Sequence, residues 1–237
     1  MNGTQLPATR KKILEMLSVE VLLVSILFIV SLFVFGFIVQ EVVLENEKAF
    51  DDKVYGFFSP LATPRFIEVM KIFTFLGSVQ FLIPAYIVLI GYFIIKKQTR
   101  YTIDIAIIAL SSTALIFGLK YFFHRQRPSL PIIRTLTTYS FPSGHMLSSF
   151  VFCSILAFII IKGKWKKIYK WLASIVLFLL AVTIGISRIV LKAHFPTDVI
   201  ASLCLGIVWV ILSFYILKKI EREYMIKTKI FSDQPGS

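Results

Sequence analysis

Charged residues are scarce in this 237-residue chain, where they make up 16% of the sequence. Soluble domains average roughly 25% charged residues, and the hydrophobic share here is 57% with a mean hydropathy of +0.81. This balance argues against a soluble domain and predicts a polytopic membrane protein. Acidic residues number 13 against 26 Lys and Arg. The basic residues lie in short runs between apolar segments, a pattern that orients membrane proteins, so we expect no nucleic-acid partner.

Cysteine and histidine are also rare. The two cysteines, Cys153 and Cys204, fall inside apolar segments and are expected in the core, and no disulfide framework or CxxC motif is present. The three histidines are His124, His145 and His194, and no acidic cluster stands beside them at ligand spacing. The sequence therefore predicts no metal site and no cofactor.

Features of targeting and repetition are missing as well. The first apolar run is about twenty residues long, and no small-residue cleavage site follows it, so we expect an uncleaved first span. No internal repeat or low-complexity segment interrupts the chain. We therefore expect one membrane-embedded domain over residues 1–237.

Six apolar segments are long enough to cross a bilayer core, which needs about 20 residues per helix. They lie at roughly 19–40, 73–95, 103–122, 144–161, 170–187 and 197–217. The sequence therefore predicts an all-α integral membrane protein, a bundle of six transmembrane helices. We expect Pro84 to kink the second span, and we expect the aromatic, Pro-rich stretch 54–66 to lie at the membrane interface.

The loops predict an orientation. Basic residues gather in four places on one side of the expected topology, near 10–12, 96–100, 162–170 and 218–229, whereas acidic residues gather at 41–52 on the other side. The positive-inside rule then places both termini in the cytoplasm. The loops 41–72, 123–143 and 188–196 face outward, and the last two contain nearly every unusual polar residue of the chain.

Those polar residues form three clusters. The first is KYFFHRQRP, residues 120–128; the second is PSGH, 142–145, at the start of an apolar segment; the third is SRIVLKAHFPTD, 187–198. Each alone has an ordinary explanation, such as snorkelling cations, a helix N-cap or a local hydrogen bond. His124 and Arg125 are interpreted as interfacial polar residues, with contact to lipid headgroups as the alternative.

Together the clusters are typical of a site for a multiply charged oxyanion. Arg matches phosphate oxygens with a fork of donors, Lys acts as a point charge, and a helix start offers free N–H groups. Gly lets the backbone approach an anion closely, and Ser adds a hydroxyl donor. The candidate phosphate-binding residues are Lys120, Arg127, Ser143, Gly144 and Arg188.

The two histidines of these clusters suit phosphoryl transfer. His194 precedes Asp198 by four residues, so on a helical turn the carboxylate can hold one ring nitrogen. The other nitrogen is then free to attack phosphorus. His145 is the candidate general acid for the departing oxygen, and the candidate base for water in a second step. Ser202 and Gly206 continue the Asp198 face at four-residue steps and favour close helix packing.

The pattern K-x6-R-P, P-S-G-H and S-R-x5-H-x3-D resembles that of the type 2 phosphatidic acid phosphatases, a superfamily that also includes soluble vanadium haloperoxidases. All three motifs match without substitution over about 80 residues. The resemblance implies a six-helix bundle and metal-independent phosphatase chemistry. It also implies His194 as nucleophile, Asp198 as its support and His145 as acid.

Size and topology are similar to those of bacterial plasma-membrane phosphatases that act on phosphatidylglycerol phosphate and undecaprenyl pyrophosphate. The expected function is hydrolysis of such lipid phosphates, or of phosphatidic acid, at the extracytoplasmic face through a phosphohistidine. This activity would serve phospholipid synthesis or recycling of the cell-wall lipid carrier. The expected partners are the membrane and a phospholipid or polyprenyl phosphate substrate, without an obligate protein partner. The alternative is a phosphate or lipid transporter without catalysis.

Overall fold

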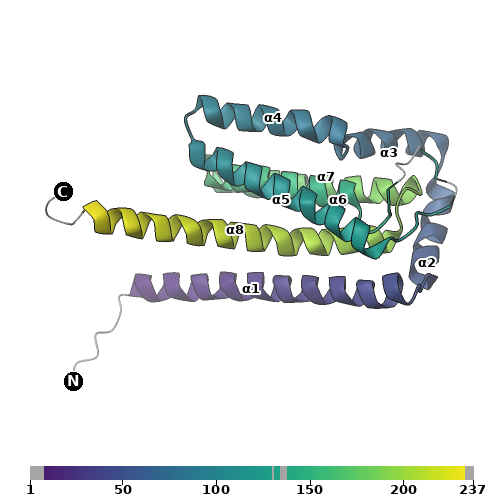
Figure 1. The fold of residues 1–237 in the computed structure, drawn as a ribbon, viewed down its shortest axis with the longest axis horizontal. Helices are drawn as coiled ribbons and strands as arrows, with labels where there is room; N and C mark the ends of the chain where they lie inside the picture. Colours follow the sequence, from purple (N-terminus) through teal and green to yellow (C-terminus); the bar gives the residue numbers. More distant parts are fainter. Residues whose placement is uncertain (1–7, 130, 134–137, 233–237) are drawn as a thin grey trace, which may run out of the picture.

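The structure is a computed structural model that describes the backbone of residues 8–129, 131–133 and 138–232, and the side chains of 19–129, 131–133 and 138–224. Within these ranges every regular element is helical. The elements are α1 (Ala8–Ile38), the π-helix η1 (Val39–Leu44), α2 (Ala49–Phe58), the 3-10 helix η2 (Ser59–Leu61), α3 (Pro64–Leu76), α4 (Val79–Ile95), α5 (Thr99–Phe123), α6 (Gly144–Lys162), α7 (Lys167–Val190) and α8 (Pro196–Ser232). The long helices lie side by side in an elongated bundle, and α2 lies across one end of it (Figure 1).

The expected transmembrane segments are present. Among the described residues, five helical segments are long and apolar enough to cross a membrane, and α3 with α4 makes a sixth when the bent pair is taken as one span. The five are Val19–Leu44, Thr99–Phe123, Gly144–Lys162, Lys167–Val190 and Pro196–Tyr224. The six expected segments fall on these helices, so the expected all-α bundle is confirmed.

The second span differs from the expectation. Pro84, where we predicted a kink, lies inside α4, whose helical hydrogen bonding continues past it, and the kink stays a prediction. The chain bends by 42° between α3 and α4, at Gly77 and Ser78. The outward segment 41–72 was expected as loop and interfacial chain, yet most of it is helical, because α2 and the first half of α3 lie there.

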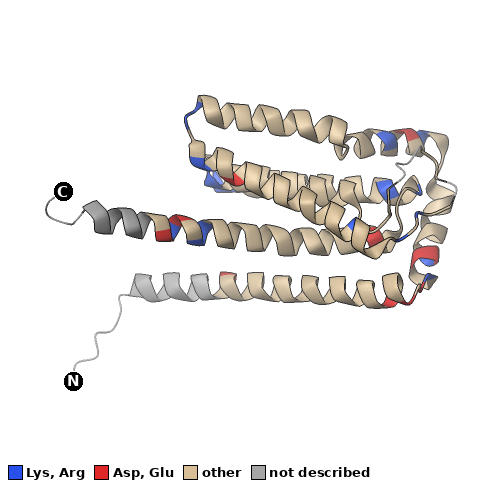
Figure 2. Ribbon diagram, viewed as in Figure 1, with Lys and Arg blue, Asp and Glu red and all other residues tan. Residues whose placement is uncertain are grey.

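The surface of the bundle is apolar, as suits lipid rather than water. Large side chains such as Phe33, Val88 and Phe122 expose 72%, 72% and 75% of their area. Lipid tails accept such surfaces, whereas every backbone polar group must be satisfied within the helices. Charged side chains gather at the two ends of the bundle, and the middle is nearly free of them (Figure 2).

Small residues bring α6, α7 and α8 together near one end. A Cβ atom at Gly206 of α8 would lie 2.8 Å from the Phe150 ring of α6, and one at Gly185 of α7 would lie 2.8 Å from Val199. Ser202 is fully buried in the same region. The close packing expected at Ser202 and Gly206 is therefore present. Cys153 is buried as expected, and Cys204 is half-buried.

Candidate active site

The three polar clusters meet at the end of the bundle where α2 lies. Lys120 lies in the last turn of α5, and Arg188 lies in the last turn of α7. Ser143 directly precedes α6, and His194 lies two residues before α8. The charges of Lys120, Arg127, Arg188 and His194 all act electrostatically on His145. Residues separated by up to 78 positions in the sequence, from 120 to 198, therefore surround one small region.

His194 is held by Asp198 through one ring nitrogen. Nδ1 of His194 lies 3.4 Å from Oδ2 of Asp198, and both side chains are buried. We expected both residues on one helical turn, but His194 precedes the first residue of α8, Pro196. The two side chains still meet, because Asp198 is the third residue of α8 and faces back toward the residues that precede the helix. Its Oδ2 accepts the N–H of Phe195 at 3.0 Å, in the manner of a capping box.

The other ring nitrogen of His194 faces a cation. Nη1 of Arg127 lies 3.3 Å from Nε2, and a guanidinium has only donors, so Nε2 is unprotonated and its lone pair accepts this hydrogen bond. Burial lowers the pKa of His194 from 6.5 to about 3; Asp198 opposes this shift, and the charges of Arg127 and Arg188 add to it. The imidazole is therefore neutral, with its proton on Nδ1 toward Asp198.

The start of α6 offers unpaired donors. Ser143 occupies the N-cap position, but its hydroxyl makes no capping bond, and Oγ is buried without a hydrogen-bond partner among the described residues. The backbone N–H of Ser143 donates to Ser202 Oγ at 2.6 Å. The first N–H groups of a helix lack intrahelical partners, so Gly144 and the residues after it also present donors there. An anion would satisfy the Ser143 hydroxyl and the free N–H groups of the first helical turn.

Arg188 has a similar unpaired donor. Nη1 donates to Thr74 Oγ1 of α3 at 2.5 Å, whereas the buried Nε atom has no hydrogen-bond partner within the described part of the chain. Arg188 as a whole is 5% exposed, which is rare for an arginine without an anionic partner. Arg188 is therefore oriented by Thr74 and keeps donor capacity for a ligand.

Lys120 and Arg127 both bind the chain segment before α6. The Lys120 ammonium donates to the carbonyl oxygens of Tyr139 and Ser140, the latter at 3.3 Å. Arg127 donates to the carbonyl oxygens of Thr138 and Ala193, each at 2.7 Å. Burial lowers the pKa of Arg127, but the nearby Asp198 opposes that shift. These cations thus position the loop as well as offering charge to a bound anion.

His145 lies against the bend between α3 and α4. A Cβ atom at Gly77 would overlap the Ile184 side chain and would come within 3.4 Å of Cδ2 of His145. The glycine therefore lets the bend approach α7 this closely, next to the His145 ring. The bend brings a fourth set of residues, including Thr74, to the three clusters that the sequence singled out.

The sequence interpretation was wrong for Arg125. We expected an interfacial side chain, but that of Arg125 is only 10% exposed, and its Nη1 lies 2.5 Å from Oδ1 of Asp198. Nη2 lies 2.9 Å from Oδ2 of Asp51, a buried residue of α2. Burial raises the pKa of Asp51 above its usual value, and hydrogen bonds from Thr197 and Arg125 oppose that shift only in part. No spacing pattern connects residues 51 and 125, so the sequence offered no signal for this pair.

Ser140 is a further missed residue. Its hydroxyl donates to Oδ2 of Asp198 and lies 3.4 Å from Nδ1 of His194. The segment between the first two motifs thus contributes to the support of Asp198.

His124 agrees better with the expectation, because its side chain is exposed. It adopts a left-handed conformation at the end of α5, and its ring contacts the Tyr139 ring edge-on.

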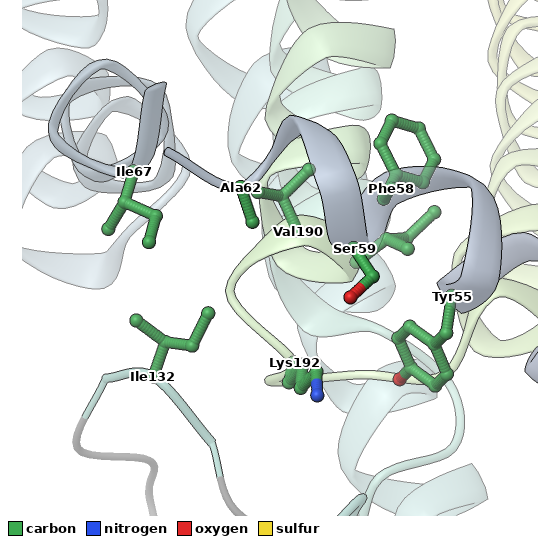
Figure 3. A pocket seen from close by; sticks show the side chains of 9 residues that line it. Tyr55, Phe58, Ser59, Ala62, Ile67, Ile132, Val190 and Lys192 are labelled. Carbon is green, nitrogen blue, oxygen red and sulfur yellow. The ribbon is translucent and has the colours of Figure 1, made fainter. Parts of the chain in front are cut away.

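α2 also borders a pocket beside residues 191–195, the loop that contains His194. The Tyr55 hydroxyl donates to the carbonyl oxygen of His194 at 2.8 Å. Burial, with the carboxylates of Asp198 and Asp51, raises the pKa of Tyr55, so the hydroxyl stays a donor. Figure 3 shows the pocket, of about 130 Å³, lined by Tyr55, Phe58, Ser59, Ala62, Ile67, Ile132, Ile189, Val190 and Lys192. None of the candidate phosphate-binding residues lines this pocket, so the pocket is separate from the candidate phosphate site.

Metal ligands were not expected from the sequence. Within the described ranges, no group of three or more His, Cys, Asp and Glu side chains could hold a metal ion. Metal-independent chemistry remains a prediction.

Comparisons with known proteins agree with the motifs and the fold. The model of the PAP2 superfamily matches residues 101–222, just over half of the chain. Phosphatidylglycerophosphatase B of Bacillus subtilis (strain 168) is 28% identical over 161 residues, which are 66% of this chain and 75% of that protein. The crystal structure of a transmembrane PAP2-type phosphatidylglycerolphosphate phosphatase from Bacillus subtilis has a TM-score of 0.71 and 26% identity, and covers 83% of this chain and 96% of its own. The crystal structure of Aquifex aeolicus LpxE has a TM-score of 0.56 and 26% identity, and the match covers 70% of this chain and 96% of that chain. The chain therefore belongs to the PAP2 superfamily.

Proposed function

We propose that this chain is a membrane lipid phosphatase that cleaves a phosphomonoester or pyrophosphate headgroup through a phosphohistidine. One observation carries the proposal: the unprotonated Nε2 of His194 faces Arg127 in a region where two buried donors, Ser143 Oγ and Arg188 Nε, have no partner among the described residues. A nucleophile beside unpaired donors suits an anion that is attacked where it binds.

In the first step, the lone pair of His194 Nε2 attacks phosphorus. The bond between phosphorus and the lipid oxygen breaks, and its electron pair leaves with that oxygen, which takes a proton from His145. The ring of His194 then carries the phosphoryl group on Nε2 and the proton on Nδ1, so it is positively charged. Asp198 stabilises this charge, while Lys120, Arg127, Ser143, Gly144 and Arg188 bind the phosphoryl oxygens.

In the second step, water attacks the phosphohistidine. Its proton passes to His145, the bond between phosphorus and Nε2 breaks, and the electron pair returns to His194. The products are inorganic phosphate and the lipid alcohol, or the lipid monophosphate where the substrate is a pyrophosphate, and His145 is again the protonated acid. No metal enters either step.

Phosphatidylglycerol phosphate is the first candidate substrate, because the similar curated protein and the similar solved structure, both from Bacillus subtilis, are named for it. Undecaprenyl pyrophosphate and phosphatidic acid are the further candidates. The apolar exterior supports a lipid that enters sideways between helices with its headgroup at one end of the bundle. The reaction would then serve phospholipid synthesis or recycling of the cell-wall lipid carrier.

The site is proposed to face the extracytoplasmic side. The basic loop residues at 96–100 and 162–170 lie at the end of the bundle opposite the site, where positive charge favours the cytoplasm (Figure 2). Reporter fusions after Lys97, Lys167 and Lys219 should therefore report cytoplasm, and a fusion after Asp52 should report the outside. An outside signal after Lys167 would move the site to the other face.

Phosphate release from purified protein tests the function. We expect turnover of at least one lipid in a matched panel of the three candidates, and loss by about a thousandfold or more in His194→Ala. Asp198→Asn should bind substrate but turn it over slowly. EDTA should leave the rate unchanged. Binding without phosphate release in the wild-type protein would favour the transporter alternative.

A further inference from the structure

A chain of buried charges extends from α2 to the nucleophile. Arg125 lies between two carboxylates, 2.9 Å from Asp51 and 2.5 Å from Asp198. Asp198 in turn lies 3.4 Å from His194 Nδ1. Asp51 and Asp198 are 1% and 0% exposed, so water screens these charges little. The charge state of Asp51 is therefore felt through Arg125 at Asp198.

Asp51 is an ionised acceptor in this arrangement. Its Oδ1 accepts the N–H of Thr197, and its Oδ2 accepts the Thr197 hydroxyl and an Arg125 N–H, at 2.8, 2.8 and 2.9 Å. Every neighbour donates, so no proton is needed on the carboxyl. The two carboxylates and one guanidinium then leave a net charge of one negative beside His194.

That net charge matters because His194 becomes cationic when it is phosphorylated. If Arg125 were paired with Asp198 alone, the pair would be neutral, and the phosphorylated imidazole would lack a compensating charge in a buried site. Asp51 shares Arg125 and so leaves the negative charge of Asp198 available to the ring. Fixed charges aimed at a charge that develops during reaction are the largest source of catalysis in many enzymes.

We propose that Asp51 and Arg125 are positioning residues that set the charge and the orientation of Asp198 toward His194. This inference rests on the proposed function and extends it to α2, which none of the three motifs includes. Arg125 holds Oδ1 of Asp198, so that Oδ2 faces the ring, and Asp51 balances the charge of Arg125. Neither residue touches the substrate.

A purely mechanical role for α2 is the competing explanation. α2 also binds the loop that contains His194 through Tyr55, whose hydroxyl donates to the His194 carbonyl oxygen. Loss of a mechanical contact would disturb the loop whether or not a charge changed. The charge explanation differs, because two substitutions that restore the net charge should compensate each other.

The test measures phosphorylation and dephosphorylation rates of purified full-length protein in detergent, with p-nitrophenyl phosphate as probe. Asp51→Asn keeps the size of the side chain and makes the cluster neutral. We expect it to slow phosphorylation about tenfold, with KM changed less than about threefold, because buried charges of one network couple this strongly. Dephosphorylation should not slow, since the less stabilised phosphohistidine is the better leaving group.

The double variant Asp51→Asn/Arg125→Gln decides between the explanations. It returns the net charge to one negative, so it should phosphorylate faster than either single variant. Asp52→Asn is the matched control, because Asp52 is the exposed neighbour on the same helix, and it should behave as wild type. Tyr55→Phe removes a mechanical contact without changing charge, and we expect it to alter the ratio of the two rates less than Asp51→Asn does.

Three results would overturn the inference: wild-type rates in Asp51→Asn, a double variant that does not exceed the rates of both single variants, or a Tyr55→Phe variant with the same ratio of rates as Asp51→Asn. Thermal unfolding and gel filtration of each variant show whether a lost rate reflects lost folding. If Asp51→Asn alone misfolds, the rates of the double variant test the inference. An inactive wild-type protein would instead refute the proposed function, and the inference with it.

Discussion

Nη1 of Arg127 lies 3.3 Å from Nε2 of His194, on the side of the ring opposite Asp198. A guanidinium cannot accept a hydrogen bond, so this contact assigns the lone pair of the ring to Nε2 and the proton to Nδ1. The same arginine donates to two backbone carbonyl oxygens of the surrounding loops. The His194 ring is thus oriented from both sides by other groups of the protein.

His194 should stay neutral far below the pH at which an ordinary histidine becomes charged. Burial and the charges of Arg127 and Arg188 disfavour the imidazolium and lower the pKa to about 3, although Asp198 opposes them. With only three histidines in the chain, ¹⁵N NMR of histidine-labelled protein can follow each ring. We expect a neutral, Nδ1-protonated signal that persists to about pH 4 and is missing in His194→Ala. Titration of that signal with a midpoint near 6.5 would contradict the assignment.

His145→Ala should discriminate between leaving groups. A lipid alkoxide needs a proton as the bond breaks, whereas a nitrophenolate hardly does, so the acid matters in proportion to the basicity of the leaving group. We expect loss of about a hundredfold or more on a lipid phosphate and much less in initial phosphorylation by p-nitrophenyl phosphate. His194→Ala should lose both substrates equally. Equal losses in His145→Ala would mean that His145 mainly binds phosphate.

Ser143→Ala should raise the stability of the fold and lower the activity. The Ser143 hydroxyl is buried and has no partner among the described residues, a state that costs about 1–3 kcal/mol. Its removal should raise the melting temperature by about 2–4 °C per kcal/mol regained and lower turnover about tenfold or more. Ser202→Ala is the matched control, because the Ser202 hydroxyl bonds the Ser143 N–H and the Asp198 carbonyl oxygen, and its loss should lower stability. A lower melting temperature in Ser143→Ala would mean that its hydroxyl supports the fold.

Gly77→Ala should act as a weak version of His145→Ala. The added methyl group would overlap Ile184 and would contact the His145 ring, so either the bend between α3 and α4 or the Ile184 side chain must shift beside that ring. A displacement of about 1 Å at a catalytic group can cost a hundredfold, and we expect at least tenfold on a lipid phosphate with less effect on p-nitrophenyl phosphate. Gly91→Ala, in α4, meets no atom within 4 Å and should be neutral. Equal rates in the two variants would show that the bend does not position the acid.

The sequence by itself determined the helical spans and the identity of the three clusters. Hydropathy and i,i+4 spacing are local properties, so six apolar segments and the pair His194 and Asp198 could be predicted without coordinates. The tertiary structure alone decided where the second span bends, since Pro84 is tolerated in α4 while the approach of Gly77 to Ile184 and His145 depends on three separate helices. It also decided the role of Arg125, because its partners Asp51 and Asp198 lie 74 and 73 residues away in sequence. A charge near a helix end looks interfacial in sequence, and only packing shows that another element has buried it and supplied its counter-charge.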